Sequence, residues 1–535
     1  MSAPRRLATS ALGGLLLALS LPPWPGSTGS WPLGVVGAAV VFAAVDGRRL
    51  RARLGAGMAA GLGLYLPGLW WMRDFNVPGF VVVVVLESAI LAGALALVPS
   101  SERRGAGPGG RVAAFPAALV VAEAARGAWP FGGLPLAGIE LGQVAGPLAP
   151  AARLGGRLLI VALVGLAGAA LASVVVSAVR AAQHRRRPDQ PVGGGGGGGE
   201  WWRGDVGAGT AALAAVVLTA IGGVMAPGGR ADGTVMVAAV QGGGPRGLRA
   251  VDGNPDEVLQ THLRVGATVG AGVDIVLWPE DVVDVPGVLA GSDEQRALAA
   301  LATALDTTLV IGVVEDVDDD NFRNAAVVFG PDGRIVDRYD KVHRVPFGEY
   351  IPARSFFARL GDVSAVPRDA IAGRGPGVVD APAPAGRAGG GTLRLGVLIS
   401  FEVFFPDRGR AAVRAGGGVL LVPTNASSFR DAQVPAHELA AARLRAIESG
   451  RWVVQAAPTG YSAVVDHHGR VLARSGLGSS AVLRQEVQVR TGRTPFVSLG
   501  PTPVLLTALA TLVAAWVVRR KKPERGNIKF DDGLD

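Results

Sequence analysis

The sequence predicts a membrane-embedded bundle of helices joined to an α/β domain in which helices pack over buried sheets. The mean hydropathy is +0.36 and only 18% of the residues are charged, which is typical of a membrane protein. Eight apolar runs lie along the 535 residues, seven before residue 230 and one near the C-terminus. From residue 234 onward, short β-rich runs alternate with helical ones, as in a layered α/β domain.

Several of the apolar runs approach the ~20 residues that a helix needs to cross ~30 Å of hydrocarbon. They lie near 7–22, 31–45, 54–71, 79–98, 112–128, 157–179, 207–226 and 502–518. Arg5 and Arg6 precede the first run as they would in a signal peptide, but six more runs follow closely, which favours a retained helix. We therefore expect about eight transmembrane helices.

Basic residues predict the orientation of these helices. Arginine-rich clusters occupy every second connection, at 5–6, 48–53, 103–111, 180–203 and 519–522. The other connections hold only Arg73, Arg153 and Arg157. By the positive-inside rule both termini are cytoplasmic and the segment between the last two helices faces outward. The net charge of +9 is divided among these clusters, so it indicates membrane topology rather than nucleic-acid binding.

The predicted organisation has three parts. Residues 1–229 form an N-terminal membrane bundle of about seven helices, 230–495 form an extracytoplasmic α/β domain, and 496–535 hold the last transmembrane helix and a basic cytoplasmic tail. In the middle part we expect a hairpin at 324–341, turned by Pro-Asp-Gly. The other expected elements are strands at 234–241, 273–280, 307–315, 392–400 and 417–425, and helices at 255–270, 294–305 and 435–449.

Three polar residues follow predicted strands of this domain. Glu280 ends "VDIVLWPE", Lys341 follows the hairpin, and Ser400 ends "TLRLGVLIS". Functional groups of α/β domains gather where strands end, so we expect the three to meet. Taken singly, each has a plain structural interpretation: Glu280 as a helix cap after a proline, and Ser400 as a small buried hydroxyl.

The lysine content of the chain also draws attention to Lys341. The chain has four lysines, and the other three, at 521, 522 and 529, lie in the C-terminal tail. Arginine stays protonated in proteins, whereas the pKa of a lysine can be tuned. An isolated lysine therefore hints at amine chemistry or at a compact donor to an oxyanion, while chance survival of one lysine is the structural alternative.

Cysteine and histidine carry little information here. The chain has no cysteine, so it has no disulfides and no thiol-based metal or redox motif. Its six histidines show no metal-ligand spacing, and we expect neither a metal nor a cofactor.

Six segments together resemble the apolipoprotein N-acyltransferases, membrane members of the nitrilase superfamily. The most specific is "YDKVHRVPFGEYIP" at 339–352, similar to the Lys-x-x-x-x-Pro-Phe-Gly-Glu-Tyr segment of that family. The others match in order and spacing: "VAAVQGGGP" at 237–245, "LWPED" at 277–281, "GVLISFEVFFPD" at 396–407, "VPTNASSF" at 422–429, and the segment 437–471. The resemblance covers nearly the whole chain. It implies an eight-helix membrane part and an outward-facing nitrilase-like αββα sandwich.

The resemblance also implies roles for particular residues. Glu280 corresponds to the general base, Lys341 to the amine that steadies an oxyanion, and Ser400 to the nucleophile. Glu349 and Glu402 match further active-site carboxylates, and Asn425 lies in a matched segment as a supporting residue. This chain departs from the family in three ways: Ser400 stands in place of cysteine, Phe401 in place of a common tyrosine, and "NASSF" lacks an Asp-x-Trp.

The implied reaction is a two-step acyl transfer. A phospholipid would donate an acyl chain to the nucleophile, and the chain would then pass to the α-amine of an N-terminal S-diacylglyceryl-cysteine on a lipoprotein. The expected setting is a bacterial cytoplasmic membrane, in which a monomeric multi-pass protein has its catalytic domain facing outward. Phospholipid, lipoprotein and bilayer are the expected partners, and nucleic acid is not.

Serine is a poor replacement for cysteine, because a hydroxyl is far less acidic than a thiol. Three interpretations of Ser400 remain: an engineered replacement, a natural enzyme with weak or altered chemistry, or a non-catalytic descendant. Two rival functions also remain. One is a nitrilase-type amidase, which leaves eight membrane helices unexplained. The other is a membrane scaffold that binds lipid or a partner such as a polyprenol-phosphate glycosyltransferase.

Overall fold

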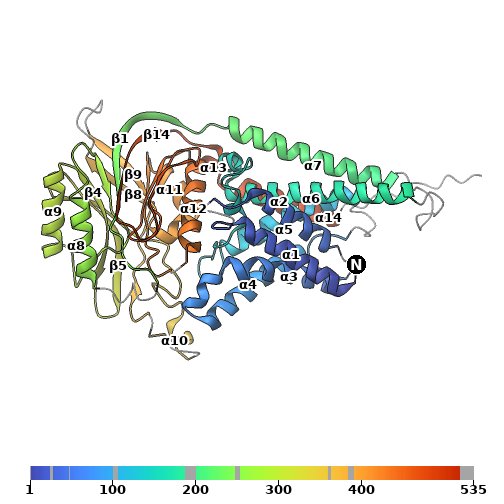
Figure 1. Ribbon diagram of the computed structural model, residues 1–535, viewed down its shortest axis with the longest axis horizontal. Coiled ribbons are helices and arrows are strands. Elements are labelled where there is room, and N and C mark those ends of the chain that lie inside the picture. Colours follow the sequence, from blue (N-terminus) through green and yellow to red (C-terminus); the bar gives the residue numbers. More distant parts are fainter. Residues whose placement is uncertain are drawn as a thin grey trace, which may run out of the picture.

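A computed structural model places a helical bundle on one side of the molecule and two β-sheets on the other (Figure 1). It describes residues 2–24, 28–46, 49–100, 107–186, 200–247, 254–359, 363–364, 366–382, 391–429 and 431–517. Parts of the basic clusters, at 48, 103–104, 187 and 519–522, lie outside these residues. The membrane orientation inferred from them therefore stays a prediction.

All eight apolar runs form α-helices. Their bounds are α1 Ala3–Ser20, α2 Trp31–Ala44, α3 Leu50–Gly68, α4 Val77–Leu95, α5 Gly107–Arg126, α6 Ala152–Arg186, α7 Glu200–Met225 and α14 Thr502–Val517. Within the described residues, three helical stretches are long and apolar enough to cross a membrane: Val77–Leu95, Ala149–Val179 and Val206–Met225. Helices α2 and α14 are apolar but shorter. The predicted helices are therefore confirmed, while the eight crossings are not.

Small residues allow the bundle helices to pack closely. Helix α1 packs against α2 and α3, and α6 contacts α2, α5 and α7. A Cβ atom added at Gly14 would lie 2.0 Å from the Ala60 carbonyl oxygen, and one at Gly63 would lie 2.2 Å from that of Ala11. Only glycine fits at these two positions, as expected where apolar helices associate through close backbone packing.

A buried cluster of charged side chains joins four elements inside the bundle. Arg126 on α5 pairs with Glu87 on α4, and it also reaches Glu123 at 2.8 Å. Arg157 on α6 lies 3.2 Å from Glu123 and 3.3 Å from Glu140, which belongs to the turn η2 (Ile139–Gln143). All five residues are buried. Arg157, which the sequence places in a connection with few basic residues, is thus a buried partner of carboxylates.

Fourteen strands within the described residues form two sheets. The first has the order β14-β1-β2-β4-β5-β6, with β3 beside β4 and β7 beside β5; the second has the order β13-β12-β11-β10-β9-β8. The first sheet contains β1 Arg230–Gln241, β2 Ile275–Leu277, β3 Val283–Val285, β4 Thr308–Asp316, β5 Asn321–Phe329, β6 Ile335–Asp340, β7 Asp369–Ala370 and β14 Ala481–Thr491. The second contains β8 Val378–Pro382, β9 Thr392–Val397, β10 Leu420–Pro423, β11 Val453–Ala456, β12 Ala463–Val465 and β13 Val471–Arg474. The predicted hairpin is confirmed as β5 and β6.

The two sheets face each other between two layers of helices (Figure 1). Helices α8 (Pro255–Gly266) and α9 (Asp293–Leu305) cover the first sheet, and α11 (Pro406–Arg414) and α12 (Gln433–Ser449) cover the second. Along β1, Val237 packs in the core between the sheets, whereas Ala238 packs in the core under the helices. Successive side chains of a strand point to opposite faces of its sheet. Because both faces of each sheet are covered, apolar residues occur at consecutive positions along the strands. The predicted αββα sandwich is confirmed.

Helix α12 connects the sandwich to the bundle. All 17 of its residues are buried. The Gln433 amide donates to the carbonyl oxygens of Pro67 at 2.8 Å and Gly68 at 3.0 Å, both near the end of α3. Further short helical elements are η1 Trp70–Asp74, η3 Ala149–Ala151, α10 Arg354–Phe357, η5 Ser400–Phe404 and α13 Pro495–Leu499. Side chains on α12 are therefore held at the boundary between the two parts.

Candidate active site

Glu280 is held in a turn that follows β2. The Gly312 N–H of β4 donates to the Pro279 carbonyl oxygen at 3.1 Å. A Cβ atom at Gly312 would lie 2.5 Å from the Glu280 Cα, so the turn can cross β4 only at a glycine. The next residue, Asp281, has a φ of 56°, in the left-handed region. The turn directs a buried carboxylate away from the strand.

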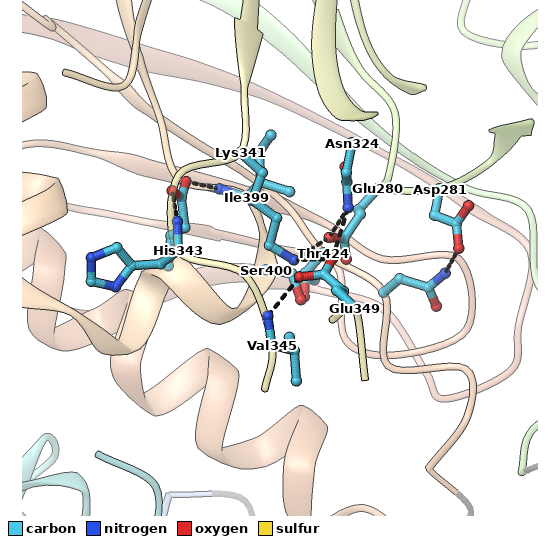
Figure 2. Close-up of polar contacts among 12 residues, drawn as sticks. Glu280, Asp281, Asn324, Lys341, His343, Val345, Glu349, Ile399, Ser400 and Thr424 are labelled. Carbon is cyan, nitrogen blue, oxygen red and sulfur yellow. Dashed lines mark hydrogen bonds and ion pairs between the residues drawn. The ribbon is translucent and has the colours of Figure 1, made fainter. Parts of the chain in front are cut away.

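Lys341 lies at the end of β6 and points into a pocket of carboxylates (Figure 2). Its Nζ donates to Glu280 Oε1 at 2.8 Å and to Glu349 Oε1 at 2.7 Å. The Asn324 amide donates to the same two oxygens, at 2.9 and 3.1 Å. Only 2% of Lys341 is exposed. The fold therefore brings together two of the three residues expected to meet, along with Glu349.

Electrostatics in this pocket keep Lys341 protonated. Burial alone would lower the pKa of Lys341, but the carboxylates of Glu280 and Glu349 outweigh burial and raise it above its ordinary value. Burial raises the pKa of Glu280, and the Lys341 ammonium opposes that shift without cancelling it. Lys341 is therefore suited to donate hydrogen bonds to an oxyanion, and it is not suited to act as a free amine.

Ser400 is the first residue of η5, in a sharp turn that follows β9. Its φ is 47°, a left-handed conformation that a residue other than glycine adopts at an energetic cost. Such strain is often kept at functional sites, where it presents a side chain at the end of a strand. Ser400 is 7% exposed. Its hydroxyl donates to Glu438 Oε1 at 3.5 Å, a long hydrogen bond.

Ser400 lies beside the Lys341 pocket, with Glu438 as a neighbour of both (Figure 2). The Glu438 carboxyl interacts electrostatically with both Glu280 and Lys341. In Figure 2 the side chains of Ser400, Lys341 and Glu280 converge on one region of the sandwich. The three residues picked out by sequence are thus gathered at one end of the sheets, with Ser400 held by Glu438 in addition.

Glu402 holds two loops together. Its carboxylate accepts from the Tyr339 hydroxyl at 2.8 Å and from the backbone N–H groups of Val342 at 3.0 Å and His343 at 3.1 Å. It also accepts from the Ile399 N–H at 2.9 Å. Glu402 therefore ties the segment after Lys341 to the turn that carries Ser400.

Replacing Glu402 with glutamine is expected to lower the free energy of unfolding by about 1–3 kcal/mol, because buried donors lose an acceptor. Glutamine keeps the size of the side chain but turns one acceptor into a donor. The measurement is an unfolding titration in detergent. The comparison variant is Tyr339→Phe, which removes one donor to Glu402 and one acceptor of the Arg408 guanidinium, and it should cost about 1–2 kcal/mol. Equal stability of E402Q and the parent would refute this role.

Asn425 lies beside the site rather than within the hydrogen-bonded group. Its amide donates to Asp281 Oδ2 at 3.5 Å, and its Oδ1 accepts from the Ser427 N–H at 3.0 Å. The latter bond closes a turn after β10, a common use of asparagine.

Sequence reasoning missed three residues of the site. Asn324 bridges two carboxylates, and Thr424 and Glu438 contact Ser400. Asn324 opens the predicted hairpin, where a polar residue beside an apolar run was the available signal. Glu438 had no such signal, because a carboxylate on a helix is normally solvated. Burial of α12 on every side is a tertiary property.

The sandwich and its Glu–Lys pair define a nitrilase-like domain carried on a membrane bundle. Residues 236–495 match the family described as carbon-nitrogen hydrolase, and residues 13–170 match the apolipoprotein N-acyltransferase N-terminal domain. The chain belongs to the apolipoprotein N-acyltransferase family.

Similar proteins include two bacterial apolipoprotein N-acyltransferases. The one from Mycolicibacterium smegmatis is 32% identical, over 70% of this chain and 63% of its own length, so the match spans less than two thirds of that relative. The one from Vibrio vulnificus is 25% identical, over 97% of this chain and 98% of its own length. A solved structure, Saccharomyces cerevisiae Nit3 of the nitrilase superfamily, is 20% identical with a TM-score of 0.35, over 49% of this chain and 92% of its own.

Proposed function

We propose that this protein transfers an acyl chain from a phospholipid to the α-amine of an N-terminal S-diacylglyceryl-cysteine on a lipoprotein. The observation that carries the proposal is the buried Lys341 ammonium between Glu280 and Glu349, at the end of the sandwich where Ser400 sits in a strained turn. The two relatives named apolipoprotein N-acyltransferase support the same activity.

The proposed organisation follows the positive-inside rule. Residues 1–229 and the helix within 496–535 cross the membrane eight times, and residues 230–495 face outward as the catalytic domain. Three long apolar stretches and five further helices support this arrangement. The protein then lies in a bacterial cytoplasmic membrane with both termini inside. Its site, near the bundle, meets two lipid substrates.

The proposed chemistry divides one exchange into two steps. Ser400 Oγ attacks the ester carbonyl of the phospholipid, a carboxylate takes its proton, and Lys341 and a backbone N–H after residue 400 stabilise the oxyanion. The ester C–O bond breaks, the leaving oxygen takes the proton, and an acyl-serine remains. The lipoprotein amine then attacks this ester, the C–O bond to Ser400 breaks, and the proton that the amine gives up passes through the carboxylate to Ser400 Oγ. Glu349 keeps Lys341 in place.

The direct test combines the purified protein with phospholipid and a diacylated lipopeptide, and it detects the N-acylated product by mass spectrometry. Ser400→Cys should raise the rate by about 10²-fold or more, because a thiol ionises more readily and is a stronger nucleophile. Ser400→Ala should give no acyl-enzyme. An S400C variant that is folded yet inert would refute the proposed activity.

The lack of any cysteine favours one alternative function. In that alternative the chain is a non-catalytic membrane scaffold whose sandwich binds lipid or a partner such as a polyprenol-phosphate glycosyltransferase. The same assay separates the two functions. An inert S400C variant that still binds phospholipid vesicles would support the scaffold, and turnover by either protein would exclude it.

A further inference from the structure

A second carboxylate lies beside the proposed nucleophile. Glu438, on α12, is 3% exposed, and it comes from an element other than those that carry Glu280 and Lys341. Its Oε1 accepts from the Thr424 hydroxyl at 2.7 Å and from the Ser400 hydroxyl at 3.5 Å. Its Oε2 is buried and has no hydrogen-bond partner among the residues that the structure describes. A buried carboxylate oxygen without a partner is costly, which points to a use beyond packing.

The two hydroxyl groups and the carboxyl form a short relay. The Thr424 and Ser400 hydroxyl oxygens lie 3.3 Å apart. Thr424 has a single proton, and its shorter contact is with Glu438. A hydrogen bond from Ser400 to Thr424 would therefore run on to Glu438. A proton leaving Ser400 can reach this carboxylate directly or through Thr424.

Glu280 is less well placed to serve Ser400. Its Oε1 already accepts from the Lys341 ammonium and from the Asn324 amide. Both donors favour its charged form and so oppose the rise in pKa that burial causes. A serine hydroxyl, which is far less acidic than a thiol, needs a stronger or closer base.

We propose that Glu438, assisted by Thr424, is the base that accepts the Ser400 proton, so that this chain has a carboxylate fitted to a hydroxyl nucleophile. The inference rests on the proposed function. As Ser400 Oγ bonds to the ester carbonyl carbon, its proton passes to Glu438. When the C–O bond to the glycerol breaks, Glu438 returns that proton to the leaving alkoxide, so atoms and charges balance.

The same carboxylate does not suit a thiol. A cysteine at 400 ionises readily without a close base, and a buried carboxylate beside a thiolate disfavours its negative charge. The identity of residue 400 should therefore decide whether Glu438 matters. This dependence separates a catalytic role from a merely structural one, because loss of packing would affect both nucleophiles equally.

The test compares four full-length proteins in detergent with phospholipid: the parent, E438Q, S400C, and S400C/E438Q. Acyl-enzyme formation is followed by rapid quenching and intact mass. In the protein with Ser400 (the serine enzyme), E438Q should lower the rate of acyl-enzyme formation by about 10²-fold or more. In the S400C protein (the cysteine enzyme), the same substitution should change this rate by less than about 3-fold, in either direction. Glu257→Gln, on the exposed face of α8, is the matched control for loss of a carboxylate.

The pH profile supplies a second readout. Burial raises the pKa of Glu438 to about 7; of the charged groups that face it, Glu280 raises the pKa and Lys341 lowers it. The base form is the deprotonated one, so the rate with Ser400 should rise as the pH passes 7. E438Q should lose this rise, and E438D should restore part of it. Thr424→Val should slow the serine enzyme selectively.

Every outcome of these experiments either supports or overturns the role of Glu438 as the base. Equal slowing of the serine and cysteine proteins by E438Q, or no slowing of either, would overturn the role of Glu438. A parent that forms no acyl-enzyme while S400C does would also overturn it, but it would leave the proposed activity of the site intact. A folded S400C without any acyl-enzyme would instead remove the proposed function itself.

Discussion

Replacing Lys341 with methionine is expected to lower the rate of acyl-enzyme formation by about 10³-fold or more, since an oxyanion donor is lost and the Glu280 and Glu349 carboxylates lose the ammonium that they share. Methionine keeps a similar length but has no charge. The Glu280 and Glu349 carboxylates would then share a buried site with Asn324 as their remaining amide donor. Like charges at such distances favour protonation of one carboxylate, which changes the charge of the site. The S400C protein is the best background for the measurement.

Two controls make the Lys341 result specific. Lys341→Arg retains the positive charge, but its planar fork is larger and the site is buried, so its rate should also fall by about 10²-fold. Arg264→Ala removes an exposed cation from α8 and should leave the rate unchanged. A K341M protein that acylates within about tenfold of its parent would contradict the role given to the ammonium.

Replacing Arg126 with leucine is expected to lower the free energy of unfolding by about 3–5 kcal/mol, because removal of one partner leaves a buried charge uncompensated. Arg126 is fully buried and serves both Glu87 and Glu123. Leucine would leave three carboxylates of this cluster with Arg157 alone. A detergent unfolding titration would measure the loss.

Matched variants test whether the Arg126 effect is electrostatic. Arg73→Leu breaks a partly exposed pair with Asp74 and should cost less than about 1 kcal/mol. Adding Glu87→Leu to R126L should recover part of the stability, because an apolar pair replaces an uncompensated charge. If R126L and R73L are equally stable, the cluster does not hold the bundle together.

Much of the fold could be predicted because local patterns determine it. The eight apolar runs become helices, and the Pro-Asp-Gly turn joins β5 and β6. Strands covered on both faces appear as continuous apolar runs, which identified β4 and β10. The local pattern does not establish that all eight helices cross the membrane. Among the described residues, three helical stretches are long and apolar enough to do so.

The candidate site was only partly accessible from sequence. Glu280 and Lys341 could be picked out because each follows a strand, and the ends of neighbouring strands lie close together. Glu349 and Glu402 were matched through the family resemblance, and the structure shows what each one holds. Asn425 was matched in the same way, yet its contacts are with a neighbouring turn.

By itself, the sequence determined which segments form helices and strands, and which polar groups stand at strand ends. These properties depend on residues close together along the chain, whose periodicity decides which face is buried. Only the tertiary structure decided that Glu438 and Thr424 would meet Ser400 and that Arg126 would meet Glu87. The physical reason is burial: packing from distant elements removes water from a side chain, and no local pattern records which partners replace it.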